Sequence, residues 1–292
     1  MSSSSVSTLV VLLGNARGGE KTWHTMYANL LEPLNADLAL LFGRCVDHSA
    51  SLYERATYVW EIEERADWGD YYRQRCATQN WSMMADRYKR TGIMGGTGKL
   101  KGSGAIILAL RDTLLGYKEF LTRYDRIILT RSDFFYVATH PDLPNDAIWV
   151  VEGEDYGGIT DRHHVFPSRL CDQALGVLAY MDSNSLLDRI RTTEKYNPEM
   201  FLLDMFRHHR IDALVRRFPR VQFTVATRDD STRWMKAMIA MPGDEQLLVK
   251  YPSEYRNAMK LNETDFDYTR FQRFMMWLSA RFQRLLLRLF GG

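Results

Sequence analysis

The sequence predicts an α/β protein in which a mixed, mostly parallel sheet is flanked by helices. Two observations support this class. Short apolar runs typical of buried strands alternate with segments typical of helices, and clusters of polar residues follow several of the predicted strands. The chain has 292 residues, of which 46% are hydrophobic and 25% are charged, as in a globular protein large enough for one α/β domain.

The first predicted unit is a strand, a helix and a second strand. Residues 7–13 form a run of leucine and β-branched residues that ends at Gly14, and residues 37–42 form a second such run. The intervening segment 22–34 has the pattern of a helix. This succession within about 40 residues predicts a parallel pair of strands joined by a right-handed crossover.

Later segments extend the pattern toward the C-terminus. Residues 52–90 are rich in aromatic and charged residues and predict helices with loops, and the glycine-rich stretch 92–104 predicts a mobile loop. Further strands are expected at residues 127–129, 147–151 and 222–226, and further helices at 105–121, 168–181 and 198–208.

The charge balance and the cysteines indicate which partners and which cellular environment the protein has. A net charge of +2, with no long basic stripe in the body of the chain, argues against a nucleic-acid partner. Cys45, Cys76 and Cys171 lie far apart in the sequence, so we expect no disulfide framework and a reducing environment. The N-terminal apolar run has the length of a strand and no basic region before it, so we expect no signal peptide and a cytoplasmic protein.

The loop after the first predicted strand, GNARGGEKTW at residues 14–23, has features of a phosphate-binding turn. Its small residues allow the backbone to approach a ligand, and Arg17 can pair bidentately with a diphosphate. Asn15, Arg17 and Gly18 are therefore candidate nucleotide-binding residues. The alternative is an ordinary glycine-rich turn between a strand and a helix, with a solvated arginine.

A second polar cluster directly follows the strand predicted at residues 127–129. Asp133 offers a hard oxygen ligand of the kind that Mg²⁺ or Mn²⁺ prefers. Such a cation would neutralise the phosphates of a nucleoside-diphosphate leaving group. The alternative is that Asp133 caps the next turn.

The third cluster is the segment 152–164, which combines acidic, basic and histidine side chains around two glycines. Burying so many charges unpaired would be costly, so the segment predicts a solvent-facing cleft. Transfer of a group to a hydroxyl requires a carboxylate base. Asp161 is the first candidate base and Glu199 the second, while Asp155 is expected to help bind the nucleotide. A salt-bridge or helix-capping role is the alternative for both candidate bases.

A resemblance adds to these expectations. The segments TRSDFFY, IWVVEGEDYGGITDRHHV and NPEMFL resemble bacterial and viral polysaccharide-synthesis glycosyltransferases of the GT-A type, and most resemble the group around the WavE-like lipopolysaccharide enzymes. This resemblance implies a Rossmann-like domain that binds a nucleotide sugar, with Asp133 in the place of the metal-binding aspartate of a D-x-D motif. Arg131 stands where that motif has its first aspartate, so Arg131 is itself expected to offer positive charge to the diphosphate, and dependence on a divalent cation is open.

The C-terminal segment has a separate character. From Tyr268 to Gly292 there are five arginines and no acidic residue, and residues 268–290 predict an amphipathic helix. Such a helix can bind the anionic inner membrane surface peripherally through its arginines. The alternative is a helix docked on the protein's own core or in a dimer interface. We therefore expect a catalytic domain at residues 1–250 and a C-terminal extension at residues 251–292.

Together these features predict a glycosyltransferase that moves a sugar from a nucleotide-diphosphate sugar to a hydroxyl of a glycan or lipid-linked glycan, with inversion. The expected partners are the sugar donor, that acceptor and the membrane surface, with Mn²⁺ or Mg²⁺ as the candidate cofactor. Two other functions stay open. A sugar nucleotidyltransferase would release pyrophosphate, and a non-catalytic glycan-binding protein would turn over no donor.

Overall fold

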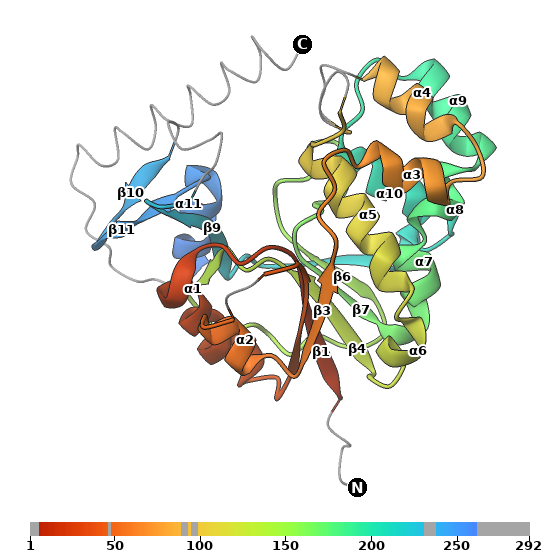
Figure 1. Ribbon diagram of the computed structural model, residues 1–292. Helices are drawn as coiled ribbons and strands as arrows, with labels where there is room; N and C mark the ends of the chain where they lie inside the picture. The colour runs from red at the N-terminus through yellow and green to blue at the C-terminus, as the bar shows by residue number, and fades with distance from the viewer. Residues whose placement is uncertain (1–5, 46–47, 89–92, 95–98, 231–237, 262–292) are drawn as a thin grey trace, which may run out of the picture.

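A computed structural model of the protein describes residues 6–45, 48–88, 93–94, 99–230 and 238–261 (Figure 1). The predicted α/β class is confirmed, because a seven-stranded mixed sheet has helices on both faces. The strand order is β3-β2-β1-β4-β7-β6-β8, and β7 alone among these seven strands runs antiparallel to its neighbours. The strands are β1 (Thr8–Gly14), β2 (Asp37–Gly43), β3 (Tyr58–Ile62), β4 (Arg126–Thr130), β6 (Ile148–Val151), β7 (His164–Pro167) and β8 (Val215–Phe218).

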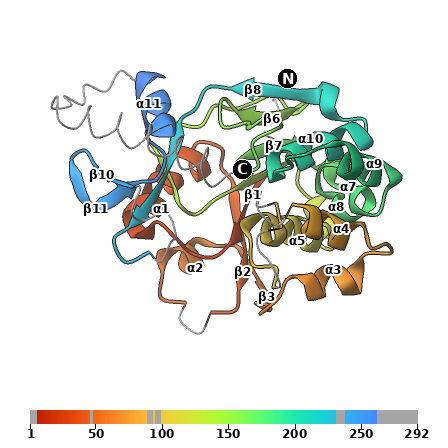
Figure 2. The same ribbon diagram turned by 90° about the horizontal axis from the view of Figure 1, so that it is seen from above.

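The two faces of the main sheet build two hydrophobic cores. Because side chains alternate along a strand, Leu9 and Val11 of β1 enter one core while Val10 and Leu12 enter the other. The first core is covered by α3 (Gly69–Arg75), α4 (Asn80–Arg87), α5 (Ser103–Leu115), α6 (Lys118–Leu121), α7 (Cys171–Leu175), α8 (Val177–Met181), α9 (Asn184–Thr192) and α10 (Pro198–His208). The second core is covered by α1 (Gly19–Met26), η1 (Tyr27–Leu31) and α2 (Ser51–Arg55). Figure 2 shows these two helical layers on opposite sides of the sheet.

The predicted elements agree with the structure most closely where the pattern was strongest. The parallel pair of β1 and β2 is confirmed, with Leu9 opposite Asp37, and α10 begins at Pro198 as predicted. The helix expected at 22–34 is α1 continued by the π-helix η1. The helix expected at 105–121 is divided into α5 and α6, and the one at 168–181 is divided into η2 (Ser168–Leu170), α7 and α8, with a break at Gly176.

A second, four-stranded sheet lies beside the main one and was not expected. It has the order β10-β11-β9-β5 and consists of β5 (Phe134–Tyr136), β9 (Gln222–Thr227), β10 (Ile239–Met241) and β11 (Asp244–Val249). The strand predicted at 222–226 is therefore confirmed as a strand, but it pairs with β5 and β11 in antiparallel fashion. The helix α11 (Pro252–Leu261) packs on this sheet and shares a third core with it.

The first part of the predicted C-terminal extension thus contributes to a packed core. Tyr255 and Ala258 of α11 are buried against Phe223 and Val225 of β9. The amphipathic helix expected at 268–290 lies outside the described residues, as does part of the glycine-rich stretch 92–104. Among the described residues no helix is both long enough and apolar enough to cross a bilayer.

Candidate functional site

A cavity of about 760 Å³ opens at the carboxyl ends of β1 to β4. The strand order reverses at β1, because β2 and β3 follow on one side of β1 and β4 lies on the other. Ligands of open α/β sheets bind at such a switch point, and the volume is within the range of small-molecule sites. The cavity is therefore the candidate site.

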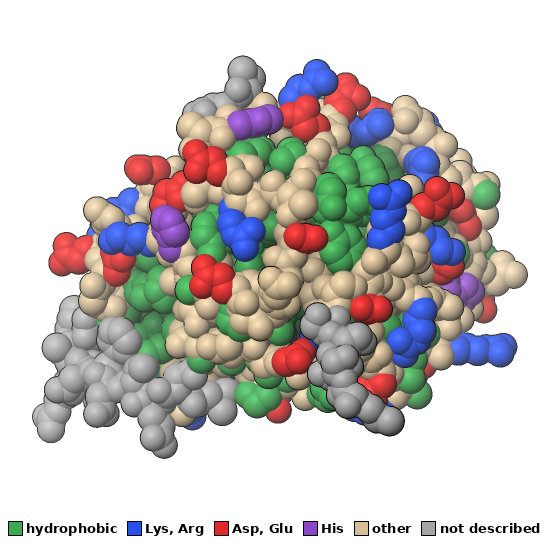
Figure 3. Space-filling view, turned by 90° about the horizontal axis from the view of Figure 1, so that it is seen from below, with side chains coloured by type: hydrophobic (Ala, Val, Ile, Leu, Met, Phe, Trp, Pro, Cys, Tyr) green, Lys and Arg blue, Asp and Glu red, His purple; other side chains and the backbone are tan. Residues whose placement is uncertain are grey.

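Positive charge gathers on the cavity wall. Among the described lining residues seven side chains are basic and four are acidic, an excess of three. On the outer face shown in Figure 3, by contrast, basic and acidic side chains are interspersed. The charged lining residues are Arg17, Glu64, Arg65, Lys101, Arg111, Arg131, Asp133, Asp161, Arg162, Glu199 and Lys250.

Ser132 joins the loops that follow β1 and β4. Its Oγ donates a hydrogen bond to the carbonyl oxygen of Asn15 at 2.9 Å and accepts one from the N–H of Arg17 at 3.1 Å. Gly18 packs behind this junction with φ at +86°, and a Cβ there would lie 3.0 Å from the Cα of Asp133. Glycine at position 18 thus permits close contact between two loops, because its left-handed backbone and missing side chain leave room.

Arg131 and Asp133 form a bidentate ion pair at the end of β4. The Nε and Nη2 atoms of Arg131 each lie 2.6 Å from a different carboxylate oxygen of Asp133. Asp133 is 4% exposed. Burial opposes its ionisation, but Arg131, Lys250 and Arg17 outweigh that effect and lower the pKa of Asp133. Both oxygens of the carboxylate are therefore already occupied by a guanidinium group.

Lys250 and Tyr251 reach the cavity from the second sheet. Lys250 directly follows β11, is 8% exposed, and is anchored by a backbone bond to Thr224 of β9. Burial, together with the neighbouring Arg131, lowers the pKa of Lys250 to about 8. The guanidinium of Arg162 lies 4.3 Å from the ring centroid of Tyr251, in a cation–π contact, and also pairs with the buried Glu254 of α11.

Two candidate bases, Asp161 and Glu199, are brought together by the loop between β6 and β7. The N–H of Ile159 in this loop donates to the carbonyl oxygen of Glu199 at 3.0 Å. The Asn197 side chain caps α10 by accepting from Met200, and it donates to the carbonyl oxygen of Tyr156 at 2.9 Å. These bonds hold the loop on the first turn of α10.

The electrostatic environment of Glu199 raises the pKa of its carboxyl group. Glu199 is 8% exposed, and burial together with the charge of Asp161 raises the pKa of Glu199 to about 7. The side chain of Asp161 is 19% exposed, with the Nε of Arg162 3.9 Å from its carboxylate. A carboxyl group that titrates near neutral pH suits proton transfer.

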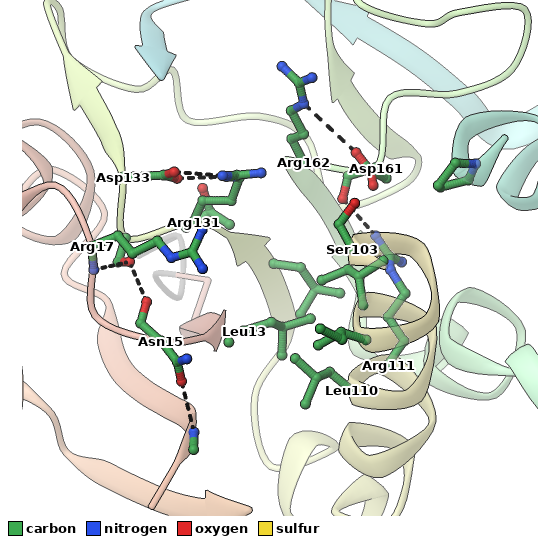
Figure 4. A pocket seen from close by; sticks show the side chains of 18 of the residues that line it. Leu13, Asn15, Arg17, Ser103, Leu110, Arg111, Arg131, Asp133, Asp161 and Arg162 are labelled. Atoms are coloured by element: carbon green, nitrogen blue, oxygen red, sulfur yellow. Dashed lines mark hydrogen bonds and ion pairs between the residues drawn. The ribbon is translucent and has the colours of Figure 1, made fainter. Parts of the chain in front are cut away.

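Arg111 of α5 contributes a buried cation on the same side of the cavity. It is 1% exposed, and its Nη2 lies 3.3 Å from the carbonyl oxygen of Asp161. Burial lowers the pKa of Arg111 to about 10, although Asp161 opposes this effect. Figure 4 shows Asp161, Arg162 and Arg111 on one side of the cavity and Arg17, Arg131 and Asp133 on the other.

Most of the residues predicted from the sequence line this one cavity. They are Asn15, Arg17, Arg131, Asp133, Asp161 and Glu199. Gly18 and Asp155 do not belong to the cavity lining. Gly18 packs against Ser132 and Asp133, and Asp155 pairs with Arg217 at 2.9 Å and accepts a hydrogen bond from the N–H of Thr160 at 3.2 Å. Both residues stabilise loops in the structure, and their part in ligand binding stays a prediction.

The residues present do not suit a divalent cation at Asp133. The ion pair with Arg131 uses both of its oxygens, and Lys250 and Arg17 add further positive charge nearby. In the described part of the chain no group of three or more potential metal ligands comes together. Divalent cations require oxygen ligands that are free to coordinate.

Several cavity residues were missed from the sequence. Lys250 and Tyr251 follow a short antiparallel strand whose pairing connects distant segments, and no local motif marks them. Arg111 lies within the largely apolar helix α5. A basic residue in such a helix was the one feature of the sequence that could have indicated a buried charge there.

No protein-family model matches the chain, and a search of curated proteins finds no match.

Proposed function

We propose that this protein is a glycosyltransferase of the GT-A type that uses a nucleotide-diphosphate sugar. One observation carries the proposal. A single cavity at the carboxyl ends of the parallel strands combines seven basic side chains with Glu199, whose pKa is raised to about 7, and with the neighbouring Asp161. The basic residues suit a diphosphate leaving group, and the carboxyl group suits removal of a proton from a hydroxyl.

In the proposed reaction Glu199 is the base. Its carboxylate takes the proton of the acceptor hydroxyl while the acceptor oxygen bonds to the anomeric carbon of the sugar. The bond from that carbon to the diphosphate oxygen breaks, and the electron pair leaves with the diphosphate. Arg17, Arg131 and Lys250 stabilise the charge that develops there, and attack opposite the leaving group inverts the anomeric configuration.

Asp161 has a supporting part in this proposal. Its negative charge raises the pKa of Glu199, so Glu199 becomes a stronger base when it is ionised. Arg162 and Arg111 lie against Asp161 and fix its position. The resemblance of the segments around Asp133 and Asp161 to polysaccharide-synthesis glycosyltransferases supports a glycan acceptor.

A ligand screen tests the proposal directly. Thermal unfolding is measured with nucleoside diphosphates and with their sugar conjugates, because a ligand at about 100 times its dissociation constant stabilises the fold by about 2.7 kcal/mol. Conjugates that raise the midpoint are then incubated with candidate glycans. Release of a nucleoside diphosphate supports glycosyl transfer. A nucleotidyltransferase would instead release pyrophosphate when it is given a nucleoside triphosphate and a sugar 1-phosphate. If no nucleotide raises the midpoint, the proposal fails.

Peripheral attachment to an anionic membrane through residues 268–290 is a separate part of the proposal. Its basis is the distribution of arginines and apolar residues in that segment. Truncation after residue 267 should abolish co-sedimentation with phosphatidylserine vesicles and leave nucleotide binding intact. Equal sedimentation of the full and truncated chains would exclude membrane attachment through this segment.

A further inference from the structure

We propose that the cavity holds the two phosphates of a nucleoside-diphosphate group through arginine and lysine side chains, and that this binding needs no divalent cation. The inference rests on the proposed function, because it concerns how the sugar donor is held. It assigns Asp133 a positioning role, in which the carboxylate orients Arg131.

The ion pair of Arg131 and Asp133 is the first support. The carboxylate accepts from Nε and Nη2 of the guanidinium, at 2.6 Å each, and these bonds leave the hydrogens of Nη1 for another acceptor. The Arg131 side chain is 30% exposed and lines the cavity, while that of Asp133 is 6% exposed. Asp133 therefore fixes one edge of a guanidinium whose remaining donors are available to an anion.

The charge around Asp133 is the second support. Arg17, Arg131 and Lys250 all act electrostatically on this one carboxylate. A divalent cation would have to displace Arg131 and then sit among like charges in a partly buried place, where Coulomb repulsion is stronger than in water. A phosphate group is instead attracted by each of these basic residues, because its charge is negative.

The third support is that these cations come from three separate parts of the fold. Arg17 follows β1, Arg131 follows β4, and Lys250 follows β11. Ser132 ties the first two loops together, and the backbone of Lys250 is bonded to Thr224. The backbone that carries each cation is thus anchored, and the guanidinium of Arg131 is itself fixed by Asp133, so these parts of the site need little rearrangement on binding.

Calorimetric titration of the full-length protein tests this inference. Inorganic pyrophosphate, UDP, GDP and CDP are each titrated in excess EDTA and, for the nucleotides, also in the presence of MnCl₂. We expect at least one of the nucleotides to bind in EDTA, with an affinity within about threefold of that measured with Mn²⁺. Pyrophosphate should bind in EDTA as well, because it carries the two phosphates without a base.

Variants identify the groups responsible. Lys250→Met and Arg131→Met should each weaken nucleotide binding in EDTA by about tenfold or more, since each removes a charged hydrogen-bond donor. Arg131→Met also frees the oxygens of Asp133, so Mn²⁺ should partly restore binding to this variant. Lys118→Met, which removes a charge paired with Asp172 on the exposed surface, is the matched control and should bind normally. Circular dichroism checks that each variant is folded.

The outcomes separate the inference from the proposed function. Binding that appears only when Mn²⁺ or Mg²⁺ is added would overturn the metal-free site and leave the glycosyltransferase proposal intact. Binding in EDTA that is unaffected in the Lys250 and Arg131 variants would also overturn it. No binding of any probe in either condition would remove both proposals.

Discussion

The backbone N–H of Ile159 lies 3.0 Å from the carbonyl oxygen of Glu199, which attaches the loop after β6 to the first turn of α10. This bond joins residues that are 40 positions apart in the sequence. Together with the bond from Asn197 to Tyr156, it places Asp161 near Glu199, and the resulting repulsion contributes to the raised pKa of Glu199. The proposed proton transfer depends on this junction.

Gly158→Ala should disrupt that junction. A Cβ at this position would lie 2.0 Å from the carbonyl oxygen of Glu199, closer than any nonbonded contact. The loop would have to move away from α10, with a cost of about 1–3 kcal/mol in the free energy of unfolding. Urea denaturation measures the stability, and turnover should fall with it.

Gly157→Ala is the matched control for that variant. Its Cβ would meet its nearest neighbour at 3.9 Å, so the substitution strains a backbone with φ at +87° without a collision. We expect a loss of about 1–2 kcal/mol and largely retained turnover. Equal losses of turnover in the two variants would contradict the importance of the contact with Glu199.

Glu199→Gln removes the proposed base and keeps the shape of the side chain. Loss of general base catalysis should lower kcat by about 10²–10⁴-fold, while the dissociation constant of the nucleoside diphosphate stays within about twofold. Steady-state kinetics and calorimetry measure the two quantities separately. A variant with normal kcat would exclude Glu199 as the base.

The acid limb of the pH profile should report Glu199. A base must be ionised, so kcat/KM should rise with pH through about 7, the value to which burial and Asp161 bring the pKa of Glu199. Asp161→Asn removes a neighbouring negative charge and should move this limb to lower pH. A limb that stays in place would contradict the coupling of the two carboxyl groups.

The alkaline limb should report Lys250. Its ammonium group must be protonated to attract phosphate, and the pKa of Lys250 is lowered to about 8 by burial and Arg131, so kcat/KM should fall as pH rises through about 8. Lys250→Arg keeps the charge at all accessible pH values, because arginine does not deprotonate there. This variant should lose the alkaline limb, and an unchanged limb would assign it to another group.

Acid should destabilise the protein through its buried histidines. Burial lowers the pKa of His140 to about 4 and that of His164 to about 3, whereas an unfolded histidine has a pKa near 6.5. The unfolded state therefore binds protons that the folded state does not, and stability falls as pH decreases from about 6.5 toward 4 and 3. The expected slope is about 1 kcal/mol per pH unit for each histidine.

Urea denaturation at several pH values measures that slope. His164→Asn should reduce the pH dependence below pH 6, although the loss of its bond to Thr160 lowers stability at neutral pH as well. His24→Asn makes the same substitution on the exposed surface of α1 and is the matched control. An unchanged slope in the His164 variant would contradict this assignment.

The main sheet was predictable where several apolar residues follow one another. The runs around Leu9 and Leu40 are buried on both faces, so they could be recognised without knowledge of their partners. The strand β3 was missed because its residues are half-buried or exposed in alternation and carry charge and aromatic rings. The strand β7 was missed because it is four residues long and ends in Pro167.

The part of the site that lies at the ends of the parallel strands was predictable from the sequence. The carboxyl ends of parallel strands share one edge, so Arg17 and Asp133 were expected together, and they line one cavity. The ion pair of Asp133 with Arg131 depends on the turn into β5, where the carbonyl of Asp133 accepts from the N–H of Val225 in β9. The place of Lys250 depends on the same long-range pairing, which local sequence does not encode.

The reversed direction of β7 has a consequence for where two of the cavity's charged side chains lie. Because β7 starts at the edge where β6 ends, the segment between them leaves and returns on the same side of the sheet without a helical crossover. Asp161 and Arg162, at the end of this segment, therefore stay at the edge where the cavity opens. A parallel strand in the place of β7 would start at the opposite edge, and the residues that precede it would be carried away from the cavity.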